Sequence, residues 1–261
     1  MNKNELILDK VRSLTYHELG TGKMLLRRTS LEDPSLACTA EGEEVTDAVG
    51  ALITTLYRAK RATISGTNSL ISLDLAAAQY GTQKEVATAE KKITDYTYEI
   101  LTPDATSHKI TLAHEPIGEI KYIYLLTDGE VAQTYEAAAE AGDGKFVHAS
   151  GSKEITLGEN ATGKFYIEYK YESTDGVRVA NMASNFPEAG SLIVYAYFRD
   201  KCNENVVYSG KIVAAKAKLN PENVELALTS TGKHPFEFVI NKDYCAEDGE
   251  DELFSIIVTS D

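Results

Sequence analysis

Short runs that alternate polar and apolar residues fill the second half of the chain. Within 164–169 the apolar side chains recur at every second position, which is typical of a strand with one packed face and one wet face. Asp-Gly pairs punctuate these runs, as turns between strands do. The pattern predicts a mainly β fold, an antiparallel β-sandwich or barrel, rather than alternating β-α-β units. We expect strands at 96–101, 109–112, 120–126, 153–157, 164–171, 191–198, 209–214, 224–228, 236–240 and 253–258.

The first 66 residues have a less regular pattern. Apolar residues recur at roughly helical spacing within 4–14, which predicts a short helix or a terminal arm. Residues 23–28 and 52–66 read as strands. The segment 30–56 follows the first of these strands and overlaps the start of the second. It is rich in acidic residues and poor in large apolar ones, so we expect a long loop or an extended hairpin that projects from the body.

One or two short helices are predicted in the middle of the chain. The Ala-rich run 70–78 favours a helix that Asn68 or Ser69 caps by accepting a hydrogen bond from a free backbone N–H. Gly81 is well placed to end that helix in the left-handed conformation. A second short helix is expected within 84–91.

The pattern also sets an expected domain organisation. Residues 1–95 would supply the arm, the long loop, a strand and a helix of the main body, and 173–261 the strands that complete the sandwich. The β-rich part, 96–172, is a candidate inserted or surface subdomain, and 85–95 is the best place for a boundary. Within that part, the Ala- and Glu-rich 133–141 is expected to form a helical turn or a loose insertion.

Composition narrows the range of functions. The chain has 261 residues, enough for one large β domain or two modest ones, and 15 tyrosines but no tryptophan. Its net charge of −14 repels nucleic acid phosphates and anionic membranes, which argues against a role in reading DNA. The same charge suits a wall along which DNA slides without sticking, although solubility alone also explains it.

The pattern of cysteines and the absence of a long apolar run predict a protein that is made and folded in the cytoplasm. The number of cysteines is odd and no Cys-x-x-Cys occurs, so neither a zinc site nor a disulfide framework is expected, and the three thiols read as small buried apolar groups. No run of about 18 apolar residues predicts a membrane span. The cysteines are Cys38, Cys202 and Cys245.

A search for catalytic motifs finds none. Gly20-Thr21-Gly22-Lys23 resembles the end of a phosphate-binding loop, but His17 stands where that loop needs glycine and Met24 where it needs Ser or Thr. The five histidines are scattered, and no Gly-x-Ser-x-Gly occurs. The acidic run 247–252 lacks the spacing of a calcium loop and reads as a solvated turn. We therefore predict a protein that is not an enzyme and needs no cofactor or metal.

Two blocks of opposite charge lie close together near the start of the chain. Either they face water, or they meet the opposite block of a neighbouring copy, as a head-to-tail interface requires. On the second interpretation they are candidate contacts between subunits. The acidic block is Glu41, Glu43, Glu44 and Asp47, and the basic block is Arg58, Lys60 and Arg61.

The order of these elements resembles the phage tail tube (major tail) proteins and their relatives among virion β-sandwich proteins. The closest local likeness is 40–50, Ala-Glu-Gly-Glu-Glu-Val-Thr-Asp-Ala-Val-Gly, followed by the strand that ends in 60–66, Lys-Arg-Ala-Thr-Ile-Ser-Gly. The chain is longer than a minimal tube subunit, which indicates an added loop or domain within 96–172. The matching features, in order, are an N-terminal arm at 4–14, a strand at 23–28, an acidic projecting loop at 34–55, a returning strand at 56–66, a helix at 68–81 and the strands after Tyr96.

The resemblance implies a mechanical role. Six copies would pair their edge strands into a ring with a continuous β-barrel as its inner wall, and rings would stack through 30–56 and the terminal arm. The lumen would be acidic and let DNA pass as cargo that does not stick. The implied partners are further copies of the chain and other virion proteins, without a membrane, and the implied location is the virion, assembled in the host cytoplasm.

Two other functions remain open from the sequence. A capsid decoration or head-to-tail connector protein shares the β-sandwich pattern, but it would stay monomeric or trimeric instead of forming tubes. A carbohydrate-binding or adhesion module would be stabilised by glycans in a thermal shift screen.

Overall fold

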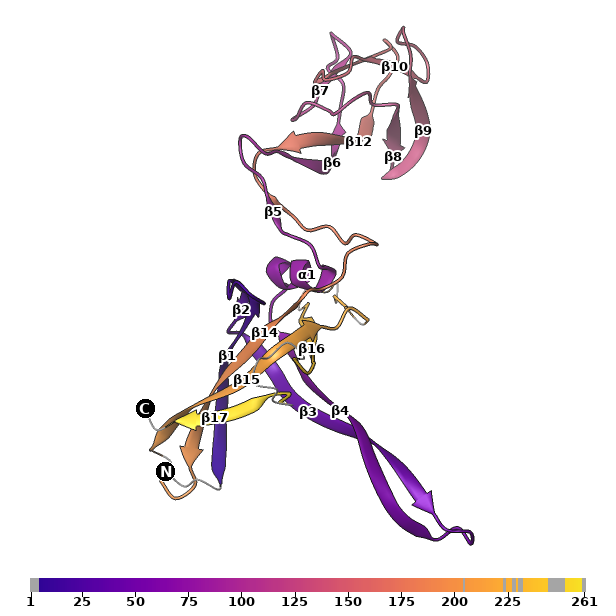
Figure 1. The fold of residues 1–261 in the computed structure, drawn as a ribbon. Coiled ribbons are helices and arrows are strands. Elements are labelled where there is room, and N and C mark those ends of the chain that lie inside the picture. Colours follow the sequence, from indigo (N-terminus) through magenta and orange to yellow (C-terminus); the bar gives the residue numbers. More distant parts are fainter. Residues whose placement is uncertain are drawn as a thin grey trace. The chain divides into compact units, whose positions relative to one another are not determined.

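The computed structural model describes residues 5–203, 205–222, 224–226, 229, 232–243 and 252–259. The chain forms two compact units (Figure 1). Unit 1 contains Met1–Lys84 and Val179–Asp261, and unit 2 is Glu85–Arg178, inserted between the two parts of unit 1. The ranges expected from the sequence were 1–95, 96–172 and 173–261.

The prediction of a mainly β, antiparallel fold is confirmed. Unit 1 holds one large sheet in the order β2-β1-β14-β15-β16-β4-β3, with β17 paired to β15 beside this path. All of its strand pairs are antiparallel. Its strands are β1 (Leu6–Glu18), β2 (Met24–Arg28), β3 (Leu31–Thr46), β4 (Leu52–Asn68), β14 (Ala189–Asp200), β15 (Val207–Leu219), β16 (His234–Ile240) and β17 (Ser255–Thr259).

The long strand β15 has two partners on the side away from β14. Ser209–Val213 pairs with β17, and Ala217–Leu219 pairs with β16. The sheet therefore branches along β15, with β17 on one branch and β16, β4 and β3 on the other.

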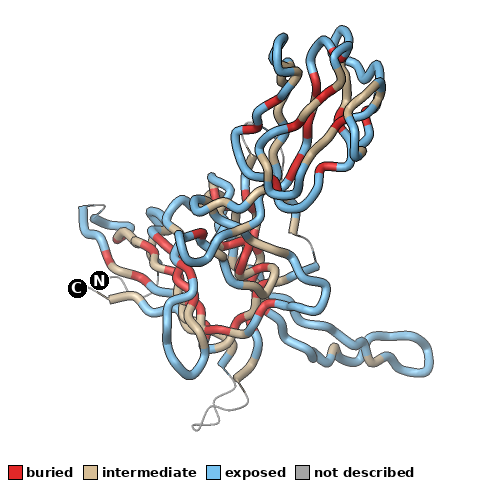
Figure 2. Tube along the Cα trace, turned by 90° about the horizontal axis from the view of Figure 1, so that it is seen from above, coloured by how far each residue is buried: buried red, intermediate tan, exposed pale blue. Residues whose placement is uncertain are grey.

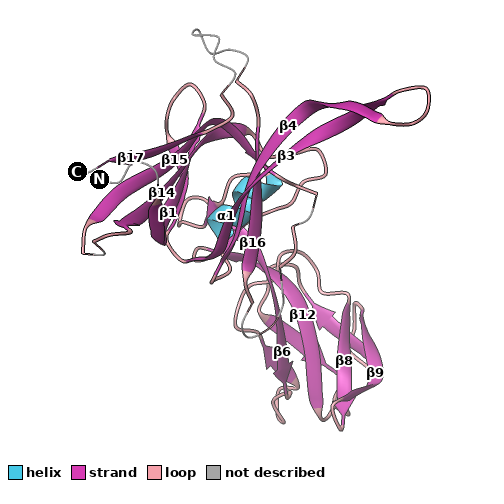
Figure 3. Cartoon of the chain, turned by 90° about the horizontal axis from the view of Figure 1, so that it is seen from below, coloured by secondary structure: helices cyan, strands magenta, loops and turns pink. Residues whose placement is uncertain are grey.

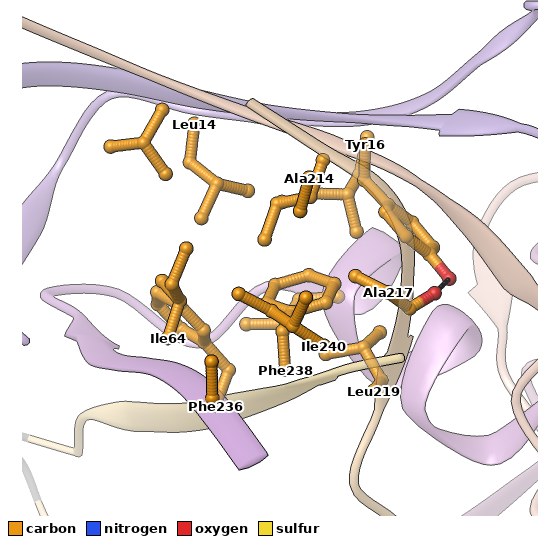
Figure 4. Packing of buried hydrophobic residues seen from close by; sticks show 14 residues of the cluster. Leu14, Tyr16, Ile64, Ala214, Ala217, Leu219, Phe236, Phe238 and Ile240 are labelled. Carbon is orange, nitrogen blue, oxygen red and sulfur yellow. Dashed lines mark hydrogen bonds between the residues drawn. The ribbon is translucent and has the colours of Figure 1, made fainter. Parts of the chain in front are cut away.

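The core of unit 1 lies between these branches and the helix α1 (Leu73–Tyr80). Figure 4 shows the side chains of Leu14, Ile64 and Phe238 converging, with Tyr16 at one end of the cluster. The Tyr16 and Phe238 rings pack with centroids 5.0 Å apart. Burying such apolar area is the main favourable term in folding.

The caps of α1 differ in part from the prediction. Ser72, not Asn68 or Ser69, is the N-cap, and its hydroxyl accepts a hydrogen bond from the Leu75 N–H at 3.3 Å. Asn68 is instead the last residue of β4, where its side chain donates to the Leu70 carbonyl. Gly81 ends the helix with φ 64°, as predicted. A Cβ at Gly81 would also lie 2.2 Å from the Phe186 carbonyl oxygen, so only glycine fits.

The helix expected at 84–91 is wrong, and of the two alternatives for 4–14, a short helix or a terminal arm, the helix is wrong. Residues 84–91 contain the short strand β5 (Glu85–Val86) instead of a helix. The expected helix or arm at 4–14 is a strand along its described residues, because β1 pairs with β14 from Leu6 onward. The expected loop or hairpin of 30–56 is the hairpin of β3 and β4.

Unit 2 is a second antiparallel assembly with its own core. Its larger sheet has the order β6-β12-β8-β9-β10-β11-β7, with one short parallel pair between β9 and β10. Phe146, Phe165 and Ile167 are fully buried at its centre. The strands are β6 (Ile93–Leu101), β7 (Lys109–Thr111), β8 (Tyr122–Thr127), β9 (Glu130–Ala137), β10 (Lys145–His148), β11 (Glu154–Leu157) and β12 (Lys164–Ser173), and β5 pairs with β13 (Val177–Arg178) in a separate ribbon.

Of the predictions for single turns and short segments, one turn is confirmed and others are wrong. Asp128 and Gly129 have φ 54° and 86° and form the two-residue turn between β8 and β9, as the Asp-Gly pair predicts. The helical turn or insertion expected at 133–141 is wrong, since β9 continues to Ala137. Residues 224–226 are not in a strand, and 227–228 and the acidic run 247–251 lie outside the described residues.

Candidate assembly surfaces

Four strands of unit 1 form a continuous group in the order β1, β14, β15 and β17, with β1 and β17 as its outer strands. Lys10, Tyr197, Ser209 and Thr259 lie in one row across it. On the side of β1 away from β14, pairing with β2 starts only at Leu14, so Leu6–Val11 has no partner strand among the described residues. Within the same described part of the chain, nothing pairs with the outer edge of β17. Unpaired strand edges present free N–H and C=O groups to another chain.

The directions of these strands permit head-to-tail pairing. Each neighbour in the group is antiparallel to the next, so β17 runs antiparallel to β1. A second copy that placed its β1 beside β17 would therefore continue the antiparallel alternation without a break. Such heterologous contacts close into rings when the rotation between copies allows it.

The two faces of the four-stranded group have different characters. One face packs on the core through Val11, Leu14 and Val194. The other face has no core beside it and carries Tyr197, with the Lys10 ammonium 5.9 Å and the Arg12 guanidinium 5.8 Å from the ring centroid. The next row on this face is formed by Ser13, Tyr195, Lys211 and Ile257.

Charge on that open face is not predominantly acidic. Arg199 bonds Asp9 at 2.9 Å, and this contact holds the pKa of the Asp9 carboxyl below its usual range. Lys10, Arg12 and Lys211 are exposed there. The surplus of acid expected in a lumen therefore does not lie on this face.

The hairpin of β3 and β4 forms an arm that extends from unit 1 (Figures 2 and 3). Ala62 is buried in the body, whereas the strands beyond it are almost entirely exposed. At the tip, the Asp47 carboxylate accepts hydrogen bonds from the Val49 N–H at 3.0 Å and the Ala51 N–H at 2.8 Å. Asp47, a predicted contact between subunits, thus stabilises its own turn.

The predicted contact residues of opposite charge meet within this one arm. Arg58 bonds Glu43 at 2.7 Å, and Arg61 bonds Glu41 at 3.2 Å. All four side chains are more than 60% exposed, so each pair contributes little to stability. Glu44 and Lys60 form no ion pair with the described residues. A contact of these residues with another copy stays a prediction, and it would require the paired ones to exchange partners.

Sequence reasoning did not single out the apolar side chains of the arm. Val49, at the tip, is 88% exposed and Tyr57 is 76% exposed, and three aliphatic neighbours are also open to solvent. Exposed apolar groups that gather on one element mark interaction surfaces. The available signal was the pair of apolar residues at 52–53 and again at 56–57, within a segment that is otherwise polar and acidic. The three neighbours are Leu52, Ile53 and Leu56.

The other residues considered for chemistry are the histidines, the cysteines and the acidic residues of the described chain. His234 is buried against Gln79. No three His, Cys, Asp or Glu side chains among the described residues gather to hold a metal. Cys38 and Cys202 are exposed, so their expected burial is wrong, and Cys245 lies outside the described residues. In the same described part, no helix has the length and apolar character to cross a membrane.

Comparison with known protein families gives a match. The model of the YomU/Tube protein family matches residues 6–251, nearly the whole chain. No curated protein matches the sequence significantly.

Proposed function

Because the chain belongs to the YomU/Tube protein family, we propose that it is a structural virion protein, the subunit of a phage tail tube. The family name supports a tube component without stating how the tube is built. The observation that best supports how copies of the chain assemble is the pair of free edges on the group β1-β14-β15-β17.

In this proposal β17 of one copy pairs with Leu6–Val11 of the next, and six copies close a ring. Each copy adds four strands, and closure leaves no free edge in the resulting barrel. The face that packs on the core cannot line an open channel, so the opposite face, with Tyr195, Tyr197 and Lys211, lines the lumen. On this wall Arg199 pairs with Asp9, and Lys10, Arg12 and Lys211 are exposed cations, so in this proposal the passage of DNA does not rest on an acidic lining.

The arm stacks one ring on the next. Its exposed apolar side chains would be buried against a neighbouring ring, which supplies the free energy that an isolated arm lacks. The proposed partners are thus further copies of the chain, other virion proteins at the ends of the tube, and DNA as cargo.

Cross-linking tests the ring directly. In a chain with Cys38, Cys202 and Cys245 replaced by serine, a cysteine at Ile257 is combined in turn with one at Ile7 or Lys10, all on the open face. Two cysteines are bridged only when their Cα atoms lie within about 7 Å. We expect mild oxidation of assembled protein to give a ladder of covalent oligomers that stops at six. Each single-cysteine variant is the control, because a head-to-tail contact brings no cysteine beside its own copy.

Microscopy gives the independent test. Negative-stain images of the concentrated protein should show rings or hollow tubes, and light scattering after size exclusion should give the mass of the ring. A chain that stays monomeric or trimeric at high concentration and gives no ladder would contradict the tube function and favour a decoration protein.

A further inference from the structure

One face of unit 2 carries a row of tyrosines that the core leaves uncovered. On β6, Tyr96 and Tyr98 are 64% and 61% exposed, and on β8 Tyr122 is 49% exposed. Tyr96 lies opposite Lys170 of β12, and Tyr98 lies opposite Glu168. Alternate residues of β12, including Ile167 and Tyr169, point into the core, so the tyrosine row lies on the other face of the sheet.

The rings in this row hold one another in place. Tyr98 stacks on Tyr166 with centroids 5.3 Å apart and planes 22° apart, and Tyr124 lies 6.3 Å from Tyr166 on the other side. The Lys170 ammonium lies 5.0 Å from the Tyr96 centroid. These contacts fix the ring orientations before any ligand arrives, which lowers the entropic cost of binding.

The same face is hollowed. An open depression of about 430 Å³ is lined by residues that include Tyr96, Tyr122 and Tyr124. Glu168 and Lys170 also line it, together with one further acidic and one further basic side chain, Glu119 and Lys121. Aromatic rings around a concave site with a few polar groups are the usual lining of a ligand site. The two acids and two bases balance, so the hollow favours a ligand without net charge.

We propose that this hollow binds a short stretch of a neutral polysaccharide. The apolar faces of sugar rings stack on exposed aromatic side chains, and tyrosine supplies both a ring and a hydroxyl for hydrogen bonding. Carboxylates and ammonium groups bond the many hydroxyls of a sugar, which need no counter-charge. Tyrosine here takes the place of tryptophan, which the chain lacks.

Two other ligand classes fit less well. The core of a protein–protein interface is depleted of charged residues, whereas four charged side chains line this hollow. Single-stranded nucleic acid also stacks on tyrosines, but it needs a positively charged groove, whereas the two acids and two bases of this hollow balance. The site lies wholly within unit 2 and does not depend on the proposed tube function.

Affinity electrophoresis of the full-length chain tests the proposal. The probes are native gels that contain a soluble mannan, galactan, β-glucan or dextran, beside a gel without polymer and one with single-stranded DNA. We expect at least one polysaccharide to retard the chain, and Tyr96→Ala or Tyr122→Ala to weaken that binding roughly three- to tenfold each. The matched control is Tyr57→Ala, which removes a still more exposed tyrosine from the arm of unit 1 and should leave the retardation, measured against the gel without polymer, unchanged.

Three outcomes would overturn the proposal. They are no retardation by any of the four polysaccharides, retardation that the Tyr96 and Tyr122 variants leave intact, and retardation by DNA alone. Thermal unfolding of each variant confirms that it folds. Tube formation is scored on the same samples, so a variant that assembles but loses polysaccharide binding separates this site from the tube function.

Discussion

A single buried histidine couples the stability of unit 1 to pH. His234 is fully buried, and its Nδ1 accepts a hydrogen bond from the Ser72 N–H at 3.2 Å, while Nε2 donates to Gln79 Oε1 at 2.6 Å. The neutral ring satisfies both contacts. Burial, and secondarily the charge of Arg28, lower the pKa of His234 to about 4. The histidine therefore joins the N-cap residue of α1 to β16.

We expect the stability that His234 contributes to fall as the pH falls. The folded pKa of about 4 lies below the unfolded value of about 6.5, so the unfolded chain binds the proton first. The contribution is fully present above about pH 6.5 and is lost towards pH 4, by about 3 kcal/mol in all. Urea unfolding at pH 7, 5.5 and 4 measures it, with His234→Gln as the comparison. If the variant lost as much stability as the wild type over this range, the assignment would be wrong.

Tyr16 makes a second residue-level test. Its hydroxyl donates to two carbonyl oxygens, that of Glu188 at 2.6 Å and that of Ala217 at 3.1 Å. Burial raises the pKa of this hydroxyl above its usual value. Tyr16→Phe keeps the ring but leaves the carbonyls without this donor, so we expect a loss of about 1–3 kcal/mol in the free energy of unfolding. The control Tyr57→Phe, at an exposed ring, should cost nothing measurable. Equal unfolding midpoints for the two variants would contradict the proposed role.

At the scale of elements, the error on β1 has a definite cause. Its pairing with β14 shifts register between Leu8 and Lys10 and again between Val11 and Ser13. Each shift inserts a residue into β1 and moves the next apolar side chain by one position. Leu8, Val11 and Leu14 therefore recur every three residues and imitate a helix. Strands without such bulges, such as β12, keep a period of two and were predicted correctly.

The candidate site was less visible in the sequence than the fold. Whether a strand has a free edge depends on which strands pair with it. β1 lies near the start of the chain and β17 near its end, yet both belong to the same sheet. No local pattern encodes that. The charged blocks of the arm were visible in the sequence. That the turn between β3 and β4 places Glu43 beside Arg58 was not. Pairing register, not composition, decides whether such charges face a neighbouring copy.

A strained residue in β4 offers a test of the arm. Ala59 has φ 47°, a conformation that costs an L-residue with a Cβ about 1–2 kcal/mol, and it lies where the β3–β4 register shifts between Thr39 and Glu41. Ala59→Gly should relieve this strain, with a net gain of about 0.5 kcal/mol after the greater freedom of glycine in the unfolded chain. Slower hydrogen exchange of the arm amides measures the gain. Ala59→Val should speed exchange, and identical rates in both variants would show that the bulge carries no strain.

At the scale of the whole molecule, the two units have separate cores. Among the described residues, the buried cluster of unit 1 and that of unit 2 share no member. The ends of unit 2 lie side by side, because Val86 pairs with Val177 and the Arg178 guanidinium bonds Glu85 at 2.9 Å. An insertion whose ends meet can be removed without stretching the chain that carries it.

We therefore expect each unit to fold without the other. The fragment 85–178 is much longer than about 40 residues, the length below which a domain usually needs added cross-links. Calorimetry of this fragment should therefore show one cooperative transition. Joining Lys84 to Val179 through a short Gly-Ser linker should leave unit 1 able to form rings, since both free edges belong to it. Microscopy and the six-step cross-linking ladder measure that result. If unit 1 folds but no longer assembles, contacts made by unit 2 must hold the ring, and the pairing of β17 with β1 is not sufficient to build it.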